Sequence, residues 1–114
     1  MPRIESYTFG RICIDGRQHR SDVLVFPERV EAGWWREKGH HLQLADLQSV
    51  IDCSPDTLII GTGTFGRMVV SQDLRRQLEE AGLEVVVART PVAVRKYNES
   101  FRERNVVAAL HLSC

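Results

Sequence analysis

The fold of this chain is decided by the stretch from Asp56 to Val70, which reads Asp-Thr-Leu-Ile-Ile-Gly-Thr-Gly-Thr-Phe-Gly-Arg-Met-Val-Val. It joins a short apolar run, preceded by Pro55, to a glycine-rich turn. This combination is typical of a buried strand that ends in a loop. We therefore expect residues 57–60 to form a central strand, with the other elements packed around it.

The size and charge of the chain limit its possible roles. Its 114 residues are the length of one ordinary domain, so we expect a single domain over residues 1–114. Fifteen basic side chains balance fifteen acidic ones, which argues against nucleic acid or a membrane surface as a partner. The chain has neither a signal-peptide pattern at its start nor the roughly 18 apolar residues of a membrane span. We expect a cytoplasmic protein.

The metal-binding and redox residues show no characteristic spacing. The three cysteines are far apart in the sequence and form no C-x-x-C pair, so free thiols are expected rather than a disulfide framework. The histidines and cysteines do not follow the standard ligand spacings of a metal site. We therefore expect neither a metal nor another cofactor.

The N-terminal third of the chain is expected to form strands. Asp15-Gly16 lies between residues 4–14 and 17–20, and Asp-Gly between extended segments is typical of a two-residue type I′ hairpin. Residues 22–26 end in four consecutive apolar side chains, so both faces of this strand are expected to be covered. An inner position in the sheet follows.

From Leu44 onward the apolar periodicity alternates between helix and strand. Ser71 is expected to cap a helix that stops before Gly82, and Thr90 to cap another with Pro91 in its first position. The alternation predicts right-handed crossovers between parallel strands, which together with the antiparallel start gives a mixed β-sheet with helices packed on it. The expected elements are helices over 44–54, 71–81 and 90–104, and strands over 57–60, 83–88 and 106–112.

The glycine-rich loop matches the G-x-G-x-x-G dinucleotide motif at every defined position. In that motif the third glycine lies in the helix that binds the pyrophosphate, whereas the helix expected here begins only at Ser71. No carboxylate follows the next strand, so a dinucleotide is not expected. The glycines either only allow a tight turn, or the loop binds a small anion or a protein partner. The candidate loop residues are Gly61, Thr62, Gly63, Thr64 and Gly66, with Arg89 and Thr90 from the end of the next strand.

Two adjacent tryptophans form a second candidate site. In an extended segment Trp34 and Trp35 point to opposite sides, so one ring is expected in the core and the other at the surface. The exposed ring either caps the edge of the core or contacts a partner, since tryptophan is enriched at interfaces. Trp34 and Trp35, with Arg36 as a polar rim, are the candidate partner surface.

A set of short motifs lies in a fixed order along nearly the whole chain. These are Tyr7 to Gly16, Asp22 to Leu24, Trp34 to Arg36 with Gly39-His40, Ile60 to Gly63, Thr90 with Ala93, Tyr97-Asn98, and Leu110 to Cys114. Together they resemble one family of small domains of unknown function. That family includes the adipogenesis-associated domain-containing protein and the mitochondrial NADH:ubiquinone oxidoreductase complex assembly factor three.

The resemblance implies an α/β fold with a mixed sheet, helices packed on it, and an added N-terminal antiparallel hairpin layer. Because the mitochondrial relatives act as assembly factors that bind other proteins, it favours a non-enzymatic protein-interaction module. It supplies no catalytic residues. The alternative is a small anionic-ligand-binding protein or an enzyme that uses the loop from Gly61 to Gly66.

Overall fold

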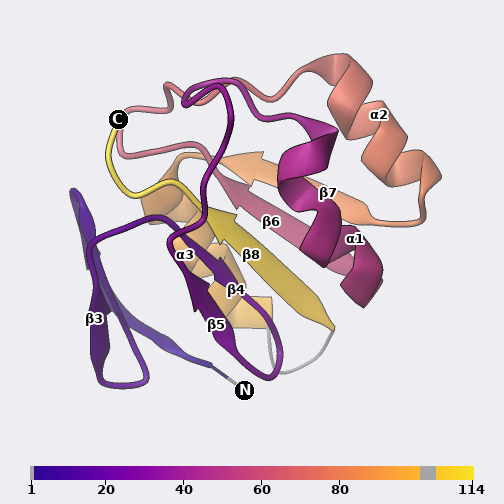
Figure 1. Ribbon diagram of the computed structural model, residues 1–114. Helices are drawn as coiled ribbons and strands as arrows, with labels where there is room; N and C mark the ends of the chain where they lie inside the picture. The colour runs from indigo at the N-terminus through magenta and orange to yellow at the C-terminus, as the bar shows by residue number, and fades with distance from the viewer. Residues whose placement is uncertain (1, 101–104) are drawn as a thin grey trace.

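The chain folds into three layers around a five-stranded mixed sheet, as the computed structural model shows for residues 2–100 and 105–114 (Figure 1). The strand order is β5-β4-β8-β6-β7. β6 pairs in parallel with both β7 and β8, while β4 pairs antiparallel with β8 and β5. The mixed sheet is therefore confirmed. β6 is an inner strand, as its apolar sequence indicates, but the middle position that was expected for it belongs to β8. The bounds are β4 Val23–Val25, β5 Val30–Ala32, β6 Thr57–Gly61, β7 Glu84–Ala88 and β8 Val106–Leu110.

One face of the sheet is covered by the short 3₁₀ helix η1 (Leu44–Leu47), by α1 (Gln48–Cys53) and by α2 (Gln72–Glu80). Leu58 and Ile60 of β6 join the apolar cluster beneath these helices. Successive residues of a strand point to opposite faces, so Ile59 belongs instead to the cluster on the other side. All five residues of β6 are buried, which accounts for its continuous apolar sequence.

The opposite face is covered by α3 (Thr90–Ser100) and by a separate three-stranded sheet of β1 (Ile4–Thr8), β2 (Arg11–Ile14) and β3 (Arg17–His19). This small sheet is the antiparallel layer that the family resemblance implied. Its predicted hairpin is confirmed, since Asp15 and Gly16 both have positive φ angles of 50° and 79°.

The sequence did not predict a second turn at Phe9-Gly10, which divides residues 4–14 into β1 and β2. Gly10 has a φ of 74°, and its N–H donates to the carbonyl of Leu112 at 2.8 Å. A single glycine between apolar and polar residues gives a weak turn signal. The distant Leu112 carbonyl completes the local structure.

Both predicted helix starts are confirmed, but only one of the two predicted side-chain caps is. The Ser71 hydroxyl accepts a bond from the Leu74 N–H at 3.0 Å and caps α2 as predicted. Thr90 does not cap α3, because its hydroxyl bonds to residues outside the helix, and the Arg89 carbonyl accepts the first helical bonds from residues 92 and 93. The end expected near Arg104 lies outside the described residues.

Two further expectations concern the whole chain. The described residues include no helix of sufficient length and apolar character to cross a lipid bilayer. The thiols of all three cysteines are free, in agreement with their spacing.

Candidate functional site

The candidate residues from distant parts of the sequence gather at one edge of the large sheet. The parallel strands β6, β7 and β8 end at this edge with Gly61, Ala88 and Leu110. β4 begins there and β5 ends there, because each runs antiparallel to its neighbour. In open α/β sheets this is where ligands and partners usually bind. We call it the carboxyl edge, and it comprises residues 9–11, 22, 33–36, 61–67, 89–90 and 111–114.

The glycine loop packs tightly against the C-terminal segment. A Cβ added to Gly61 would lie 2.8 Å from Thr90 Oγ1. Gly63 has a φ of +107°, and an added Cβ would overlap the carbonyl carbon of Cys114. Glycine is therefore required at Gly63 both by its backbone angle and by the close approach of another backbone.

Most N–H groups of this loop already have protein acceptors. Those of Thr62, Thr64 and Gly66 donate to carbonyls of Ala88, Ser113 and Gly63, at 2.9, 2.7 and 3.2 Å. The Gly63 N–H donates to Thr90 Oγ1 at 2.8 Å. An anion-binding nest needs N–H groups that point toward the ligand. The geometry of this loop therefore favours a packed scaffold over an anion seat.

Thr90 holds the loop to the end of β8. Its buried hydroxyl accepts the Gly63 N–H and donates to the His111 carbonyl at 2.6 Å. Without the Thr90 hydroxyl, both of these buried backbone groups would lose a hydrogen-bond partner. Thr90, which the sequence suggested as a helix cap, is instead a connection between three segments.

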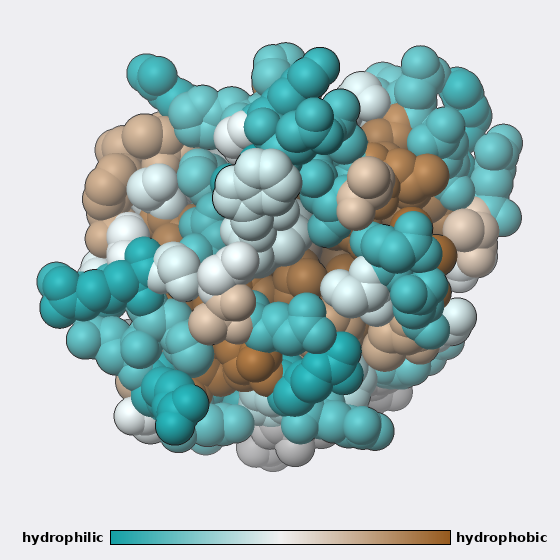
Figure 2. Space-filling view, in the orientation of Figure 1, coloured by the Kyte–Doolittle hydropathy of each residue, from teal (hydrophilic) through white to brown (hydrophobic). Residues whose placement is uncertain are grey.

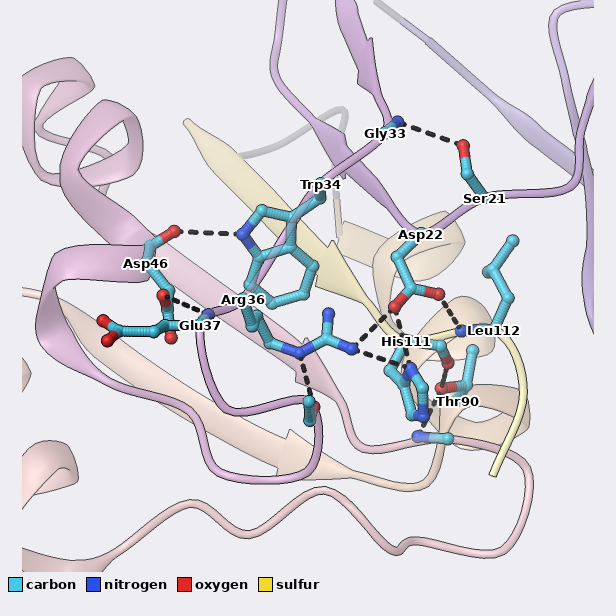
Figure 3. A network of polar contacts seen from close by, with 12 residues as sticks. Ser21, Asp22, Gly33, Trp34, Arg36, Glu37, Asp46, Thr90, His111 and Leu112 are labelled. Carbon is cyan, nitrogen blue, oxygen red and sulfur yellow. Dashed lines mark hydrogen bonds and ion pairs between the residues drawn. The ribbon is translucent and has the colours of Figure 1, made fainter.

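A buried ionic cluster joins three more segments at the same edge (Figure 3). Asp22 Oδ2 lies 2.8 Å from Arg36 Nη2 and 2.8 Å from His111 Nδ1, and Asp22 Oδ1 accepts the Leu112 N–H at 2.7 Å. Arg36 Nε donates to the Gly39 carbonyl at 2.8 Å. Asp22 thus binds the start of β4 to the loop of residues 33–39 and to the segment after β8. We call Asp22, Arg36 and His111 the Asp22 cluster.

Electrostatics fix the roles within this cluster. Burial raises the pKa of Asp22, but hydrogen bonds from His111, from the Leu112 N–H and from Arg36 outweigh that effect and lower the pKa below its ordinary value. His111 Nδ1 lies 2.8 Å from Asp22 Oδ2 and 3.1 Å from Arg36 Nη2. Because the ionised carboxylate can only accept, we assign a proton to Nδ1 from its shorter contact, the one with Asp22. The other ring nitrogen of His111, Nε2, takes no part in the contact with Asp22.

Two polar atoms of the cluster have no partner. Among the described residues, Arg36 Nη1 and His111 Nε2 are buried without a hydrogen bond. No hydroxyl or thiol of the described residues therefore pairs with Nε2, as the nucleophile of a catalytic triad would. The cluster has the histidine and carboxylate of such a triad, and its contacts are those of a structural anchor.

The structure revises the predicted partner surface at residues 34–36. Trp34 and Arg36 are only 9% and 8% exposed, whereas Trp35 is 75% exposed. The alternation of the two tryptophans is confirmed, but Arg36 does not form a polar rim, because it pairs with Asp22 and lies over the Trp34 ring at 4.7 Å. The period of two in an extended segment already places residues 34 and 36 on the same side.

A pair of exposed phenyl rings lies beside the glycine loop. Phe9 and Phe65 are 54% and 66% exposed, and their ring centroids lie 5.9 Å apart. Tyr7, two residues before Phe9, donates its hydroxyl to the Leu112 carbonyl at 2.6 Å and also bonds to Thr64 Oγ1, next to Phe65. The turn between β1 and β2 is thereby fixed against the loop. We call Phe9 and Phe65 the aromatic pair.

The surface of this face is a mosaic. Figure 2 shows brown and tan atoms in separate areas among teal ones, including an area at the upper left, near where Figure 1 places the C-terminus. Two hollows of about 390 and 320 Å³ also open on the molecule, and residues 61–66 and the Asp22 cluster line neither of them. The first is lined by Lys38, His41, Leu42, Gln43, Val69 and Ser71, and the second by Thr57, Ile59, Glu84, Val86, Lys96, Glu99 and Ser100.

Comparison with solved structures defines the class. The fold is that of a small α/β domain also seen in a Mth938-like domain protein from Bordetella pertussis, with a TM-score of 0.79, 21% identity, and coverage of 97% of this chain and 85% of that chain. The conserved hypothetical protein PH1505 from Pyrococcus horikoshii OT3 gives a TM-score of 0.83 with 24% identity over 98% of this chain and 99% of that one. The Rpa2829 protein from Rhodopseudomonas palustris gives a TM-score of 0.78 with 31% identity over 94% of this chain and 80% of that one.

The chain belongs to the family described as protein of unknown function (DUF498/DUF598), whose model matches residues 4–111. This match confirms the family resemblance inferred from the sequence motifs. The solved relatives show the fold of this family.

Proposed function

We propose that this protein is a non-enzymatic interaction module that binds a protein partner through the aromatic pair at the carboxyl edge. The observation that carries the proposal is the mutual contact of two largely exposed phenyl rings, Phe9 and Phe65. Large aromatic side chains supply much of the binding energy of protein interfaces. Water-exposed rings that already touch each other form a ready apolar contact surface.

The support beneath the pair favours binding. Phe9 follows Tyr7, which bonds to Thr64 and Leu112, and Phe65 lies in a loop whose backbone bonds to residues 88, 90 and 113. A surface that is rigid before binding loses less conformational entropy in the complex. The three glycines of the loop therefore serve to present Phe65 on a fixed support.

Two other considerations favour a protein partner over a small ligand. Most of the N–H groups that an anion would need are bonded within the protein. The family resemblance includes assembly factors that act by binding other proteins. Trp35, which is 75% exposed on the loop after β5, extends the possible contact area at the same edge of the sheet.

Site-specific photocrosslinking in the source cells tests the proposal. A photoreactive benzoylphenylalanine in place of Phe65 is expected to form one dominant covalent adduct with another protein, and Phe9→Ser in the same chain is expected to abolish it. The control places the crosslinker at Arg95, an exposed position on α3. Adducts that form equally from positions 65 and 95, or that survive Phe9→Ser, would contradict the proposed function.

A further inference from the structure

We infer that the partner segment bound by the aromatic pair is acidic, with carboxylates that flank an apolar anchor residue. This inference rests on the proposed function and adds the chemistry of the partner to it. The observation behind it is a local excess of positive charge in a chain whose total charge is zero.

Three exposed arginines lie in the segments that carry or adjoin the aromatic pair. Arg11 follows Phe9 by two residues, Arg67 follows Phe65 by two residues, and Arg89 leads out of β7 at the same edge. The one acidic side chain of the carboxyl edge, Asp22, is already paired with Arg36 and His111. The other segments that build this part of the edge contain no aspartate or glutamate. These segments are residues 6–14, 57–71, 85–94 and 106–114.

The position of Arg89 connects this charge to the rings. Its Cγ atom lies 3.2 Å from the place where a Cβ on Gly66 would be, and its Nη1 lies 3.5 Å from the Thr64 carbonyl oxygen. The Arg89 side chain therefore lies beside the backbone on both sides of Phe65, with its guanidinium group near the Thr64 carbonyl. An anchor residue placed on the Phe65 ring would bring a neighbouring carboxylate within reach of it.

No ion pair among the described residues neutralises these arginines. Over residues 2–100 and 105–114 the ion pairs use Arg29, Arg36, Arg75, Arg76 and His111 as their cations. Arg11, Arg67 and Arg89 form none of them. Guanidinium groups bind carboxylates in a planar two-bond geometry, and charge complementarity selects partners at interfaces.

The same observations argue against nucleic acid as the occupant. Nucleic-acid binding surfaces are typically extended basic patches on a domain with a high isoelectric point, whereas this chain has a pI near 6.9 and only these three arginines around the pair. A short peptide with a few carboxylates matches the size and charge of the surface. We therefore commit to an acidic protein segment.

A displayed library of random peptides tests the inference. The library is selected on the purified protein and on three variants of it. Arg11→Ser/Arg67→Ser/Arg89→Ser removes the arginines and Phe9→Ser/Phe65→Ser removes the aromatic pair. The control Arg17→Ser/Arg95→Ser removes exposed charges elsewhere. We expect the wild type and the control to enrich peptides with net negative charge and an aromatic or aliphatic residue. Removal of the three arginines should lower the affinity for these peptides about tenfold, as expected for the loss of three surface ion pairs.

The two proposals fail in different ways. Peptides that require the aromatic pair but carry no net negative charge would overturn the acidic partner and leave the proposed function standing. Enriched peptides that bind Phe9→Ser/Phe65→Ser as well as the wild type would contradict both proposals. The affinity for acidic peptides could also fall as much in Arg17→Ser/Arg95→Ser as in Arg11→Ser/Arg67→Ser/Arg89→Ser. That result would show general charge attraction and overturn the inference.

Discussion

Asp22 Oδ2 and His111 Nδ1 lie 2.8 Å apart although 89 residues separate them in the sequence. The same carboxylate oxygen binds Arg36 Nη2, so one acidic side chain joins the first strand of the large sheet, the loop after β5 and the segment after β8. The carboxyl edge, and with it the support of the aromatic pair, depends on this buried contact. Loss of this contact is therefore expected to lower the stability of the fold more than it lowers the affinity for a partner.

The stability of the protein should depend on pH through Asp22. Its pKa in the folded state is lower than the ordinary value of 3.8, so this carboxylate stabilises the fold above pH 3.8 and the contribution is lost as pH falls below that value. At pH 7, Asp22→Asn should lower the free energy of unfolding by about 3 kcal/mol. Urea unfolding should show this difference shrinking on acidification. The exposed Asp73→Asn is the control, and a pH-independent difference for Asp22→Asn would contradict the assignment.

Gly63 should not tolerate a side chain. Gly63→Ala is expected to lower the free energy of unfolding by more than about 2 kcal/mol, because the residue has a positive φ and an added Cβ would overlap the Cys114 backbone. Gly39→Ala should change it by less than about 0.5 kcal/mol, since Gly39 has open space around its Cα. Chemical denaturation compares the two. Equal effects would mean that the loop does not pack on the C-terminal segment.

The hydroxyl of Thr90 should matter more than its methyl group. Thr90→Val keeps the shape but leaves the Gly63 N–H and the His111 carbonyl without their partner, at a cost of about 2 kcal/mol or more. Thr90→Ser keeps the hydroxyl and should lose about 1 kcal/mol, mainly from the missing methyl group. Thermal unfolding ranks the variants. If valine proves as stable as serine, the connection between loop and β8 is not energetically important.

The two adjacent tryptophans should differ sharply on truncation. Trp34→Ala removes a buried ring whose Nε1 donates to the Asp46 carbonyl at 3.0 Å, and should cost about 3 kcal/mol or more. Trp35→Ala removes a ring that is 75% exposed and should change stability by about 0.5 kcal/mol or less. Equilibrium unfolding of both variants gives the comparison. A large loss for Trp35→Ala would show that this ring packs against the protein in solution.

Local patterns in the sequence were enough to predict the main sheet and both ends of the helix α2. Continuous apolar runs identified β6 and β8 as buried strands, and Ser71 and Gly82 marked the ends of α2. These signals come from neighbouring residues, whose conformational preferences act locally. They do not show which distant side chains will meet.

The missed features all depend on contacts between distant segments. Asp22 was expected only as the first residue of a strand, and its pairing with His111 follows from the fold. Thr90 was expected to cap a helix, but its hydroxyl bonds to the Gly63 N–H instead. The aromatic pair joins the turn at Phe9 to the loop at Phe65, and the sequence carries no local sign of that contact. A site built at the edge of a sheet from six segments cannot be recognised in the sequence until the strand order is known.

The most direct test of the account is an amide NMR titration of the ¹⁵N-labelled protein with the acidic peptide most enriched in the library selection. Binding at the aromatic pair predicts that the largest chemical-shift changes fall in residues 8–11 and 64–67 and at Arg89, and that they disappear in Phe9→Ser/Phe65→Ser. Largest changes on α2 and β7, or around the hollow lined by Lys38 and Ser71, would contradict the claim that this edge is the binding surface.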